Sequence, residues 1–179
     1  MNVSFKVLFI CTWAADEPYL EVLKAAKRLP ASVHIYVTGR SRGRERALED
    51  TVPDNVTLTG FVSEEEFIEL LQTADAVVDL TTREDCLVCG AYEATAAEKP
   101  LLLSNTKALR SYFHKGALFT DNTAADIARQ LLQLRNEHTR LMQEVAELKQ
   151  DLSLNWQKYR TGILDLLEQL EAGLSIQTA

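Results

Sequence analysis

The sequence predicts an α/β fold: a Rossmann-like, doubly wound and mainly parallel sheet of about six strands with a C-terminal helical extension. Two observations favour this fold class. Apolar runs rich in β-forming residues alternate with helix-like segments, with roughly 20 to 30 residues between successive runs. Most of these runs are also nearly continuous in apolar residues, as expected for strands that helices cover on both faces.

The first predicted unit is a strand, a loop and a helix. Residues 5–11 predict the strand, and residues 12–18 form a loop that ends at a proline in the first turn of the helix. Apolar residues recur at helical spacing behind this proline, and Pro30 ends the helix. These apolar positions are Leu20, Leu23, Ala26 and Leu29.

The next units follow the same order. Residues 33–37 alternate in polarity as a strand does, and a basic, glycine-containing loop follows at 38–46. Residues 55–62 predict a third strand with a turn at Gly60. Ser63 and the glutamates after it form a capping box, which predicts a helix that ends near Asp75.

A further strand, loop, helix and strand occupy the middle of the chain. Residues 76–80 and 101–104 are apolar runs typical of buried strands. The Ala-rich segment 88–99 between them predicts a helix, which Pro100 stops.

The C-terminal part of the chain is predicted to be mostly helical. A short helix at 106–113 and a short strand at 117–123 come first, and residues 123–161 then contain neither Pro nor Gly and keep close to helical spacing. A long helix or a helical pair is expected there. We therefore divide the chain into a Rossmann-like domain, residues 1–123, and C-terminal helices, residues 124–179, that pack on it or extend from it.

Composition limits the function classes. A chain of 179 residues with 46% hydrophobic content suits one domain with a sizeable core, and a net charge of −7 argues against a nucleic-acid partner. No apolar run approaches the roughly 18 residues of a membrane span, and the N-terminus lacks a signal peptide's organisation. Three cysteines without a Cys-rich pattern agree with a reducing compartment, so we expect a cytoplasmic chain.

Two carboxylates mark the predicted ligand-binding edge of the sheet. Asp85 lies in the loop after a strand and Glu93 in the following helix, and their spacing corresponds to roughly 12 Å along a helix, a distance comparable to a nucleotide-sugar. We expect a diphosphate to bind the free N–H groups of residues 86–89 at the helix start. Asp85 would then accept a sugar's hydroxyls and Glu93 a ribose's. In a doubly wound sheet, four loops would open on this edge: 12–18, 38–46, 60–63 and 81–87.

Residues 85–100 resemble the signature of the group 1 retaining glycosyltransferases of GT-B fold. In that signature Glu, seven residues and a second Glu precede Ala-x-Ala-x-Gly-x-Pro; here Glu93 is the second acid. Asp85 stands at the first acid, Glu98 replaces the usual Gly, and Glu84 becomes the first acid if the loop is shifted by one position. Residues 55–61 are also similar to the family's Asn-Val-x-Phe-x-Gly-Phe segment, which lies beside the donor's base.

The resemblance implies the donor-binding C-terminal domain of a retaining glycosyltransferase that transfers a sugar to a hydroxyl acceptor. It implies a nucleoside-diphosphate sugar as the donor substrate, and neither a cofactor nor a metal, because the donor's own phosphate oxygen is thought to assist the reaction in this family. The acceptor-binding domain would be missing or separate. The apolar C-terminal helices would meet that domain, pack on their own domain or form a homodimer.

Site residues follow from the same resemblance. We assign the catalytic positions to Asp85 and Glu93. In the family an Arg and a Lys reach the diphosphate, whereas residues 12–18 offer no cation. The predicted donor-binding residues are Thr12, Gly39, Arg40, Gly60, Phe61, Val62, Glu84, Cys86, Leu87, Val88 and Cys89.

Other functions stay open. A non-catalytic nucleotide or nucleotide-sugar binding module that acts with a partner chain is the main alternative. Cys86 and Cys89 form a C-x-x-C pair at a helix start, where dithiol chemistry is possible, but the acidic residues before the pair oppose a thiolate. Zinc would need further ligands that no spacing groups together. Arg40, Arg42, Arg44 and Arg46 would either clamp phosphate or lie in a solvated turn.

Overall fold

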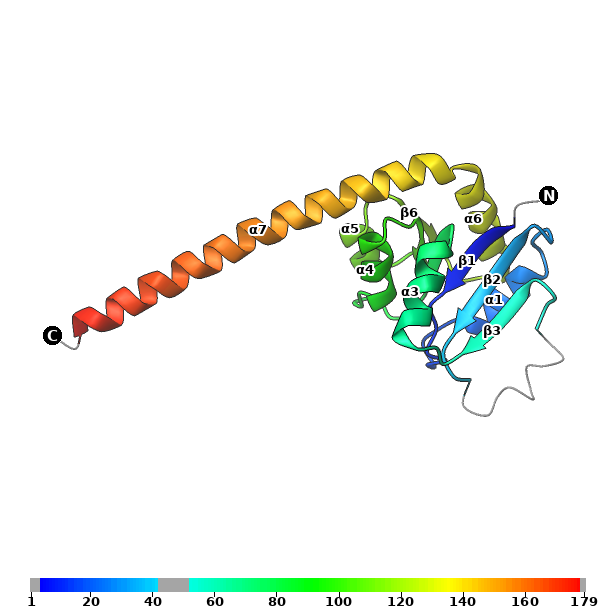
Figure 1. The fold of residues 1–179 in the computed structure, drawn as a ribbon, viewed down its shortest axis with the longest axis horizontal. Coiled ribbons are helices and arrows are strands. Elements are labelled where there is room, and N and C mark those ends of the chain that lie inside the picture. Colours follow the sequence, from blue (N-terminus) through cyan, green and yellow to red (C-terminus); the bar gives the residue numbers. More distant parts are fainter. Residues whose placement is uncertain (1–3, 42–51, 178–179) are drawn as a thin grey trace.

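A six-stranded, all-parallel sheet forms the centre of the structure. The structure is a computed structural model that describes residues 4–41 and 52–177, with side chains as far as residue 170. The strand order is β3-β2-β1-β4-β5-β6, so the chain winds outward in one direction through β3 and in the other from β4 (Figure 1). The strands are β1 (Phe5–Phe9), β2 (Val33–Thr38), β3 (Val56–Gly60), β4 (Ala76–Asp79), β5 (Leu101–Ser104) and β6 (Ala117–Thr120). The predicted doubly wound, parallel sheet is confirmed.

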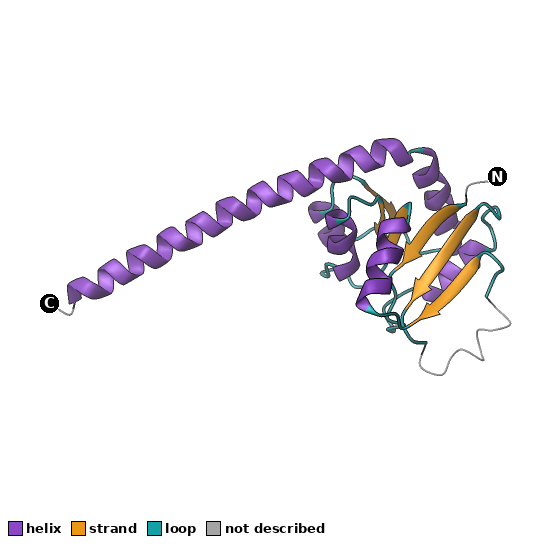
Figure 2. Cartoon of the chain, viewed as in Figure 1, coloured by secondary structure: helices purple, strands orange, loops and turns teal. Residues whose placement is uncertain are grey.

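Helices cover both faces of this sheet (Figure 2). The helices are α1 (Tyr19–Ala26), α3 (Glu64–Thr73), α4 (Cys89–Ala96), α5 (Lys107–Tyr112), α6 (Ala124–Asn136) and α7 (His138–Gln177). Helices α1 and α6 pack on one face, and α3, α4 and α5 pack on the other. Alternate residues of β1 pack on opposite faces of the sheet. Val7 and Phe9 belong to the core on the side of α1 and α6, and Leu8 belongs to the core on the side of α3, α4 and α5. All three are fully buried, which explains the continuous apolar run in the sequence.

Two local predictions about helix ends can be compared with the structure. The predicted capping box begins α3: Ser63 Oγ accepts from the Glu66 N–H at 3.3 Å, and the Ser63 N–H donates to Glu66 Oε2 at 2.8 Å. Helix α4 is shorter than the predicted segment 88–99, because it ends at Ala96 and Glu98 adopts a left-handed φ of 56°. Such a residue after a helix is commonly glycine. The structure thus explains why a glycine is expected at position 98.

The C-terminal region is a helical pair, α6 and α7. Leu131 and Leu134 of α6 and Leu141, Val145 and Leu148 of α7 are fully buried against the domain. From residue 153 to residue 170 every side chain of α7 is exposed, and this distal half extends away from the domain as a straight rod (Figure 1). Within the described residues no helix is both long and apolar enough to cross a membrane.

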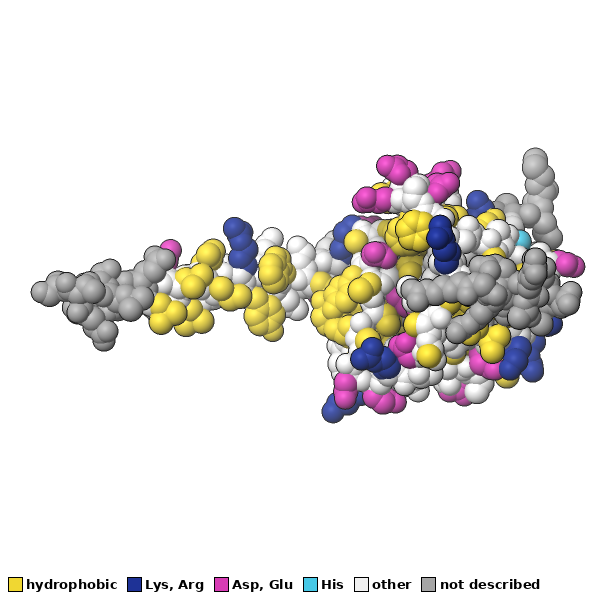
Figure 3. All heavy atoms as spheres, turned by 90° about the horizontal axis from the view of Figure 1, so that it is seen from below, with side chains coloured by type: hydrophobic (Ala, Val, Ile, Leu, Met, Phe, Trp, Pro, Cys, Tyr) yellow, Lys and Arg dark blue, Asp and Glu magenta, His cyan; other side chains and the backbone are white. Residues whose placement is uncertain are grey.

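The distal half of α7, residues 153–170, is amphipathic, although no other part of the chain that the structure describes covers it. Large apolar side chains lie along it, as Figure 3 shows for one side of the rod. Its exposed apolar residues are Leu154, Trp156, Tyr159, Ile163, Leu164, Leu166, Leu167 and Leu170. The sequence left three partners for these helices: a second domain, their own domain or a second copy of the chain. Residues 153–170 do not pack on their own domain.

The two halves of α7 should respond differently to the same substitution. Leu148→Ala, in the buried half, should lower the free energy of unfolding by about 2–5 kcal/mol, because it removes buried methyl groups and leaves a cavity. Leu166→Ala, in the exposed half, should change it by no more than about 0.5 kcal/mol. Urea denaturation of both variants measures this difference, and equal losses would show that the distal half also packs on the domain.

The exposed apolar face should make the isolated chain self-associate. Trp156 is 64% exposed and Ile163 is 53% exposed, so burying them against a second copy would remove apolar surface from water. Sedimentation velocity over a range of concentrations should show association that the double variant Trp156→Glu/Ile163→Glu abolishes. Lys158→Gln is the control on the same stretch of helix. A chain that stays monomeric at high micromolar concentration would contradict this expectation.

Candidate functional site

A large hollow lies at the carboxyl ends of β1, β2 and β3 and is closed on one side by α4. Its volume is about 810 Å³, which is within the usual range for a small-molecule site. The lining residues are Ile10, Cys11, Thr12, Thr38, Gly39, Arg40, Phe61, Val62, Ser63, Glu64, Phe67, Cys89, Gly90 and Glu93. We call this hollow the main pocket.

A smaller hollow adjoins the main pocket near the start of α4. It has a volume of about 240 Å³, and both hollows share Ile10, Thr12, Cys89 and Gly90. The rest of its lining is Asp16, Glu17, Asp79, Leu80, Thr81, Cys86, Leu87 and Val88. We call it the acidic hollow, because three of its lining side chains are carboxylates and, among the described residues that line it, none is Lys or Arg.

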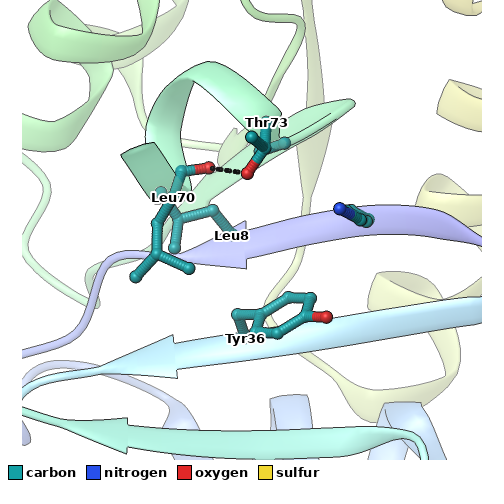
Figure 4. Close-up of a pocket in the computed structure, with 6 residues that line it drawn as sticks. Leu8, Tyr36, Leu70 and Thr73 are labelled. Carbon is teal, nitrogen blue, oxygen red and sulfur yellow. Dashed lines mark hydrogen bonds between the residues drawn. The ribbon is translucent and has the colours of Figure 1, made fainter. Parts of the chain in front are cut away.

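A third hollow, between α3 and strands β1 and β2, is a poor candidate. Its volume is about 110 Å³, and its lining side chains include Leu8, Tyr36 and Leu70, with Thr73 bonded to a carbonyl of its own helix (Figure 4). This volume is well below that of a typical ligand site.

The structure brings most of the predicted site residues together. Thr12, Gly39, Arg40, Phe61, Val62, Cys89 and Glu93 line the main pocket, and Cys86, Leu87 and Val88 line the acidic hollow. Three predicted residues, Gly60, Glu84 and Asp85, line neither hollow. Glu84 and Asp85 are exposed in the turn before α4. Gly60 instead contributes to the backbone contact between β2 and β3, where its carbonyl accepts a hydrogen bond from the Gly39 N–H at 2.9 Å. Arg42, Arg44 and Arg46 lie outside the described residues.

Gly39 fixes how closely β1 and β2 approach at the floor of the main pocket. Its φ is +86°, and a Cβ at this position would lie 2.0 Å from the Cys11 carbonyl oxygen. No larger residue fits without moving the backbone. The indole N–H of Trp13 donates to the carbonyls of Thr38 and Gly39, both at 3.1 Å, which ties the loop after β1 to the end of β2.

Phe61 and Arg40 form one wall of the main pocket. Phe61 is 76% exposed, and the Arg40 guanidinium lies over its ring at 5.8 Å from the centroid. A large exposed ring with a cation beside it is a surface on which a flat aromatic ligand can stack. Glu93, on the α4 wall, has its carboxyl pKa raised by partial burial.

Glu17 is a site residue that the sequence interpretation did not identify. Its carboxylate accepts from the Thr12 N–H at 2.9 and 3.1 Å, from the Ala14 N–H at 2.9 Å and from the Thr12 hydroxyl at 2.8 Å. The Cys11 thiol also donates to it at 3.2 Å, and burial together with this carboxylate raises the pKa of that thiol. The backbone N–H groups of Thr12 and Ala14 in the loop after β1 are therefore used within the loop.

Asp79, the last residue of β4, also accepts hydrogen bonds from backbone amides, in this case at the start of α4. It is 7% exposed, and the backbone N–H groups of Gly90 and Ala91 form hydrogen bonds that favour its charged form. Burial dominates and, with Glu17 and Glu93 nearby, raises the pKa of Asp79 to about 7. A Cβ on Gly90 would lie 2.6 Å from Asp79 Oδ2, so a glycine is required there. A sequence signal was available, since Asp79 interrupts an apolar run.

The cysteines and metal-ligating residues form no separate centre in the described part of the chain. Cys11, Cys86 and Cys89 are all free thiols, and the Cys86 thiol donates to the Leu87 carbonyl at 3.4 Å. Among the described residues no group of three or more His, Cys, Asp or Glu side chains is placed to hold a metal ion. The arrangement is that of a binding pocket with an aromatic wall and carboxylate acceptors.

Comparison with solved structures identifies the same fold in glycosyltransferases. HepE from Anabaena, in complex with UDP and glucose, matches with a TM-score of 0.72 at 13% identity over 89% of this chain and 48% of that chain. Sucrose-phosphate synthase from Thermosynechococcus elongatus matches with a TM-score of 0.74 at 18% identity over 97% of this chain and 47% of that one. The chain thus spans about half the length of these two proteins.

A third structure is matched over nearly its whole length. It is the catalytic domain of cholesterol-α-glucosyltransferase from Helicobacter pylori, with a TM-score of 0.66 at 17% identity over 83% of this chain and 98% of that chain. At these identities the likeness concerns the fold alone. No match was found among curated protein sequences.

The family itself is shown by a sequence profile rather than by these structures. The profile described as "Glycosyl transferases group 1" matches residues 5–152, which include all six strands and the buried half of α7. The fold and the pocket at the carboxyl ends of the strands agree with this match. Because the match covers most of the chain, the protein belongs to the group 1 glycosyltransferase family.

Proposed function

We propose that this chain is the donor-binding half of a retaining glycosyltransferase and that its main pocket takes a nucleoside-diphosphate sugar. The observation that carries the proposal is the main pocket itself, which has about 810 Å³ at the carboxyl ends of the strands and is lined by both Phe61 and Glu93. Ligands of doubly wound sheets bind at this edge. Family membership and the UDP and UDP-glucose held by HepE support the same ligand class.

The geometry suggests how such a ligand would lie. The base would stack on the exposed ring of Phe61, close to Val62 and beside the Arg40 guanidinium. Glu93 would accept hydrogen bonds from the ribose hydroxyls, since a carboxylate can accept from two neighbouring O–H groups. Asp85, exposed in the turn before α4, would meet the sugar at the open side.

Transfer of the sugar would need a second domain. Positioning an acceptor hydroxyl against the anomeric carbon contributes a large share of the barrier reduction, about 7–11 kcal/mol in favourable cases. The chain spans about half of the two enzymes it resembles in fold, so we assign acceptor binding to a separate or preceding domain. The exposed distal half of α7 is the surface that we assign to contact with that domain.

A non-catalytic nucleotide-binding module is the second candidate. The observation that favours it is the acidic hollow, where Asp16, Glu17 and Asp79 gather beside the start of α4. An enzyme that handles a diphosphate commonly places Arg or Lys at such a position. Residues 12–18 contain neither.

Two carboxylate variants test the proposed ligand orientation. Glu93→Ala should weaken binding of a nucleoside diphosphate and of its sugar conjugate alike, by about 10- to 100-fold for the loss of hydrogen bonds to a charged group. Asp85→Ala should weaken only the sugar conjugate. The first step is to find which base binds, by isothermal titration with UDP, GDP, ADP and TDP, each with and without glucose. The same titrations then give the dissociation constants of the variants.

Glu69→Ala provides the control, because Glu69 is exposed on α3 and lines neither hollow. Identical losses for the two variants with the free nucleoside diphosphate would refute the orientation. Absence of binding to all of these ligands by the wild-type chain would refute the proposed function.

A further inference from the structure

Two carboxylates of the chain accept hydrogen bonds from backbone amides of the loop after β1 and of the first turn of α4, next to the amides of residues 86–89 at which the sequence predicts the diphosphate. In a doubly wound fold, the hydrogen-bond donors for a nucleotide's phosphates are the backbone amides of the loop after β1 and those at the start of the helix that packs beside it. Here Glu17 accepts from the amides of Thr12 and Ala14. Asp79 takes hydrogen bonds from the amides of Gly90 and Ala91. Both carboxylates line the acidic hollow.

A carboxylate and a phosphate compete for such amides in two ways. Both accept hydrogen bonds, so an amide that donates to Glu17 is not free for a ligand's phosphate. Both are also anionic, so a phosphate in the acidic hollow would face like charges at short range. Asp16 adds a third carboxylate, which is held by the Thr81 hydroxyl at 3.0 Å. Among the described residues that line either hollow, the one basic side chain is Arg40, in the main pocket.

We propose that Glu17, with Asp79 behind it, is a specificity-determining residue that occupies the phosphate position, so that the pocket recognises a nucleotide-sugar mainly through its base and ribose. This inference rests on the proposed function, since it concerns the same pocket. It assigns to Glu17 the role of an internal competitor for the diphosphate.

Glu17 is the better target of the two residues. It belongs to the loop after β1 and makes all its hydrogen bonds with neighbours no more than six positions away, so its side chain can change without altering the sheet. Asp79 is a buried strand residue beneath α4, and its replacement affects the packing of Gly90 and Ile10 as well. Glu17→Gln keeps the size of the side chain and removes its charge.

The test compares ligands with and without phosphates. For uridine, guanosine, adenosine and thymidine, isothermal titration gives the dissociation constants of the nucleoside and of its diphosphate-glucose. In the wild type the two constants should be similar for the base that binds. In Glu17→Gln the nucleotide-sugar should bind more tightly by on the order of tenfold, which corresponds to about 1.4 kcal/mol, and the nucleoside should bind as before.

A matched variant controls for the change in net charge. Glu65→Gln changes the charge by the same amount on α3, where Glu65 is exposed and lines neither hollow. It should leave both constants unchanged. Circular dichroism melting of each variant shows whether the fold is intact.

The pH dependence supplies a second readout that needs no Glu17 variant. The titratable groups that face Asp79 are Glu17 from the loop after β1, Glu93 from α4 and the thiol of Cys11, which stays neutral because burial raises its pKa. Burial raises the pKa of Asp79 to about 7, so the carboxyl is largely neutral at pH 6 and largely charged at pH 8. Binding of the nucleotide-sugar should therefore weaken as the pH rises across this range. Asp79→Asn should flatten the profile, and nucleoside binding should stay constant.

Three results would overturn the inference. If the wild type binds the nucleotide-sugar much more tightly than the nucleoside and Glu17→Gln changes nothing, the phosphates are recognised and Glu17 does not oppose them, while the proposed function stands. If Glu65→Gln gives the same gain as Glu17→Gln, the effect is one of overall charge. If neither the wild type nor Glu17→Gln binds any of the eight ligands, the proposed function fails and the inference fails with it.

Discussion

The reversal of strand order between β1 and β4 is the constraint on which the site depends. Because β1 pairs with β2 on one side and with β4 on the other, the connections that leave their carboxyl ends go to opposite faces of the sheet. The main pocket lies at this edge, and its floor is closed by the tight contact between Gly39 and the Cys11 carbonyl. The buried residues of both faces hold the strands in register, so the core determines where the pocket residues lie.

The same strand order also brings carboxylates together at this edge of the sheet. Strand β4 ends in Asp79 directly beneath α4, and the loop after β1 folds back so that Glu17 satisfies its amides. The fold is thus that of the group 1 glycosyltransferase family, while the side chains at the proposed phosphate position are anionic. The proposed donor binding and the proposed role of Glu17 are compatible if base and ribose supply most of the binding free energy. Phe61 and Glu93 are placed to do so.

The sheet and most helices could be predicted from the sequence because their signals are local. Continuous apolar runs indicated the buried strands, and Ser63 with Glu66 indicated the start of α3. The roles of Glu17 and Asp79 could not be predicted, because they depend on which backbone amides the folded chain brings within reach. Asp85 was assigned from a motif, and the structure places it in an exposed turn outside both hollows. Its role stays a prediction.

The central claim is that the edge above β1, β2 and β3 is a ligand-binding site for a nucleotide-sugar. A titration of the ¹⁵N-labelled chain with UDP-, GDP-, ADP- and TDP-glucose, followed by amide chemical shifts, tests it most directly. One of these ligands should shift the amides of Gly39, Phe61, Cys89 and Glu93, and the amides of α5 should stay in place. Shifts confined to α5 and β6, or no shift with any of the four ligands, would contradict it.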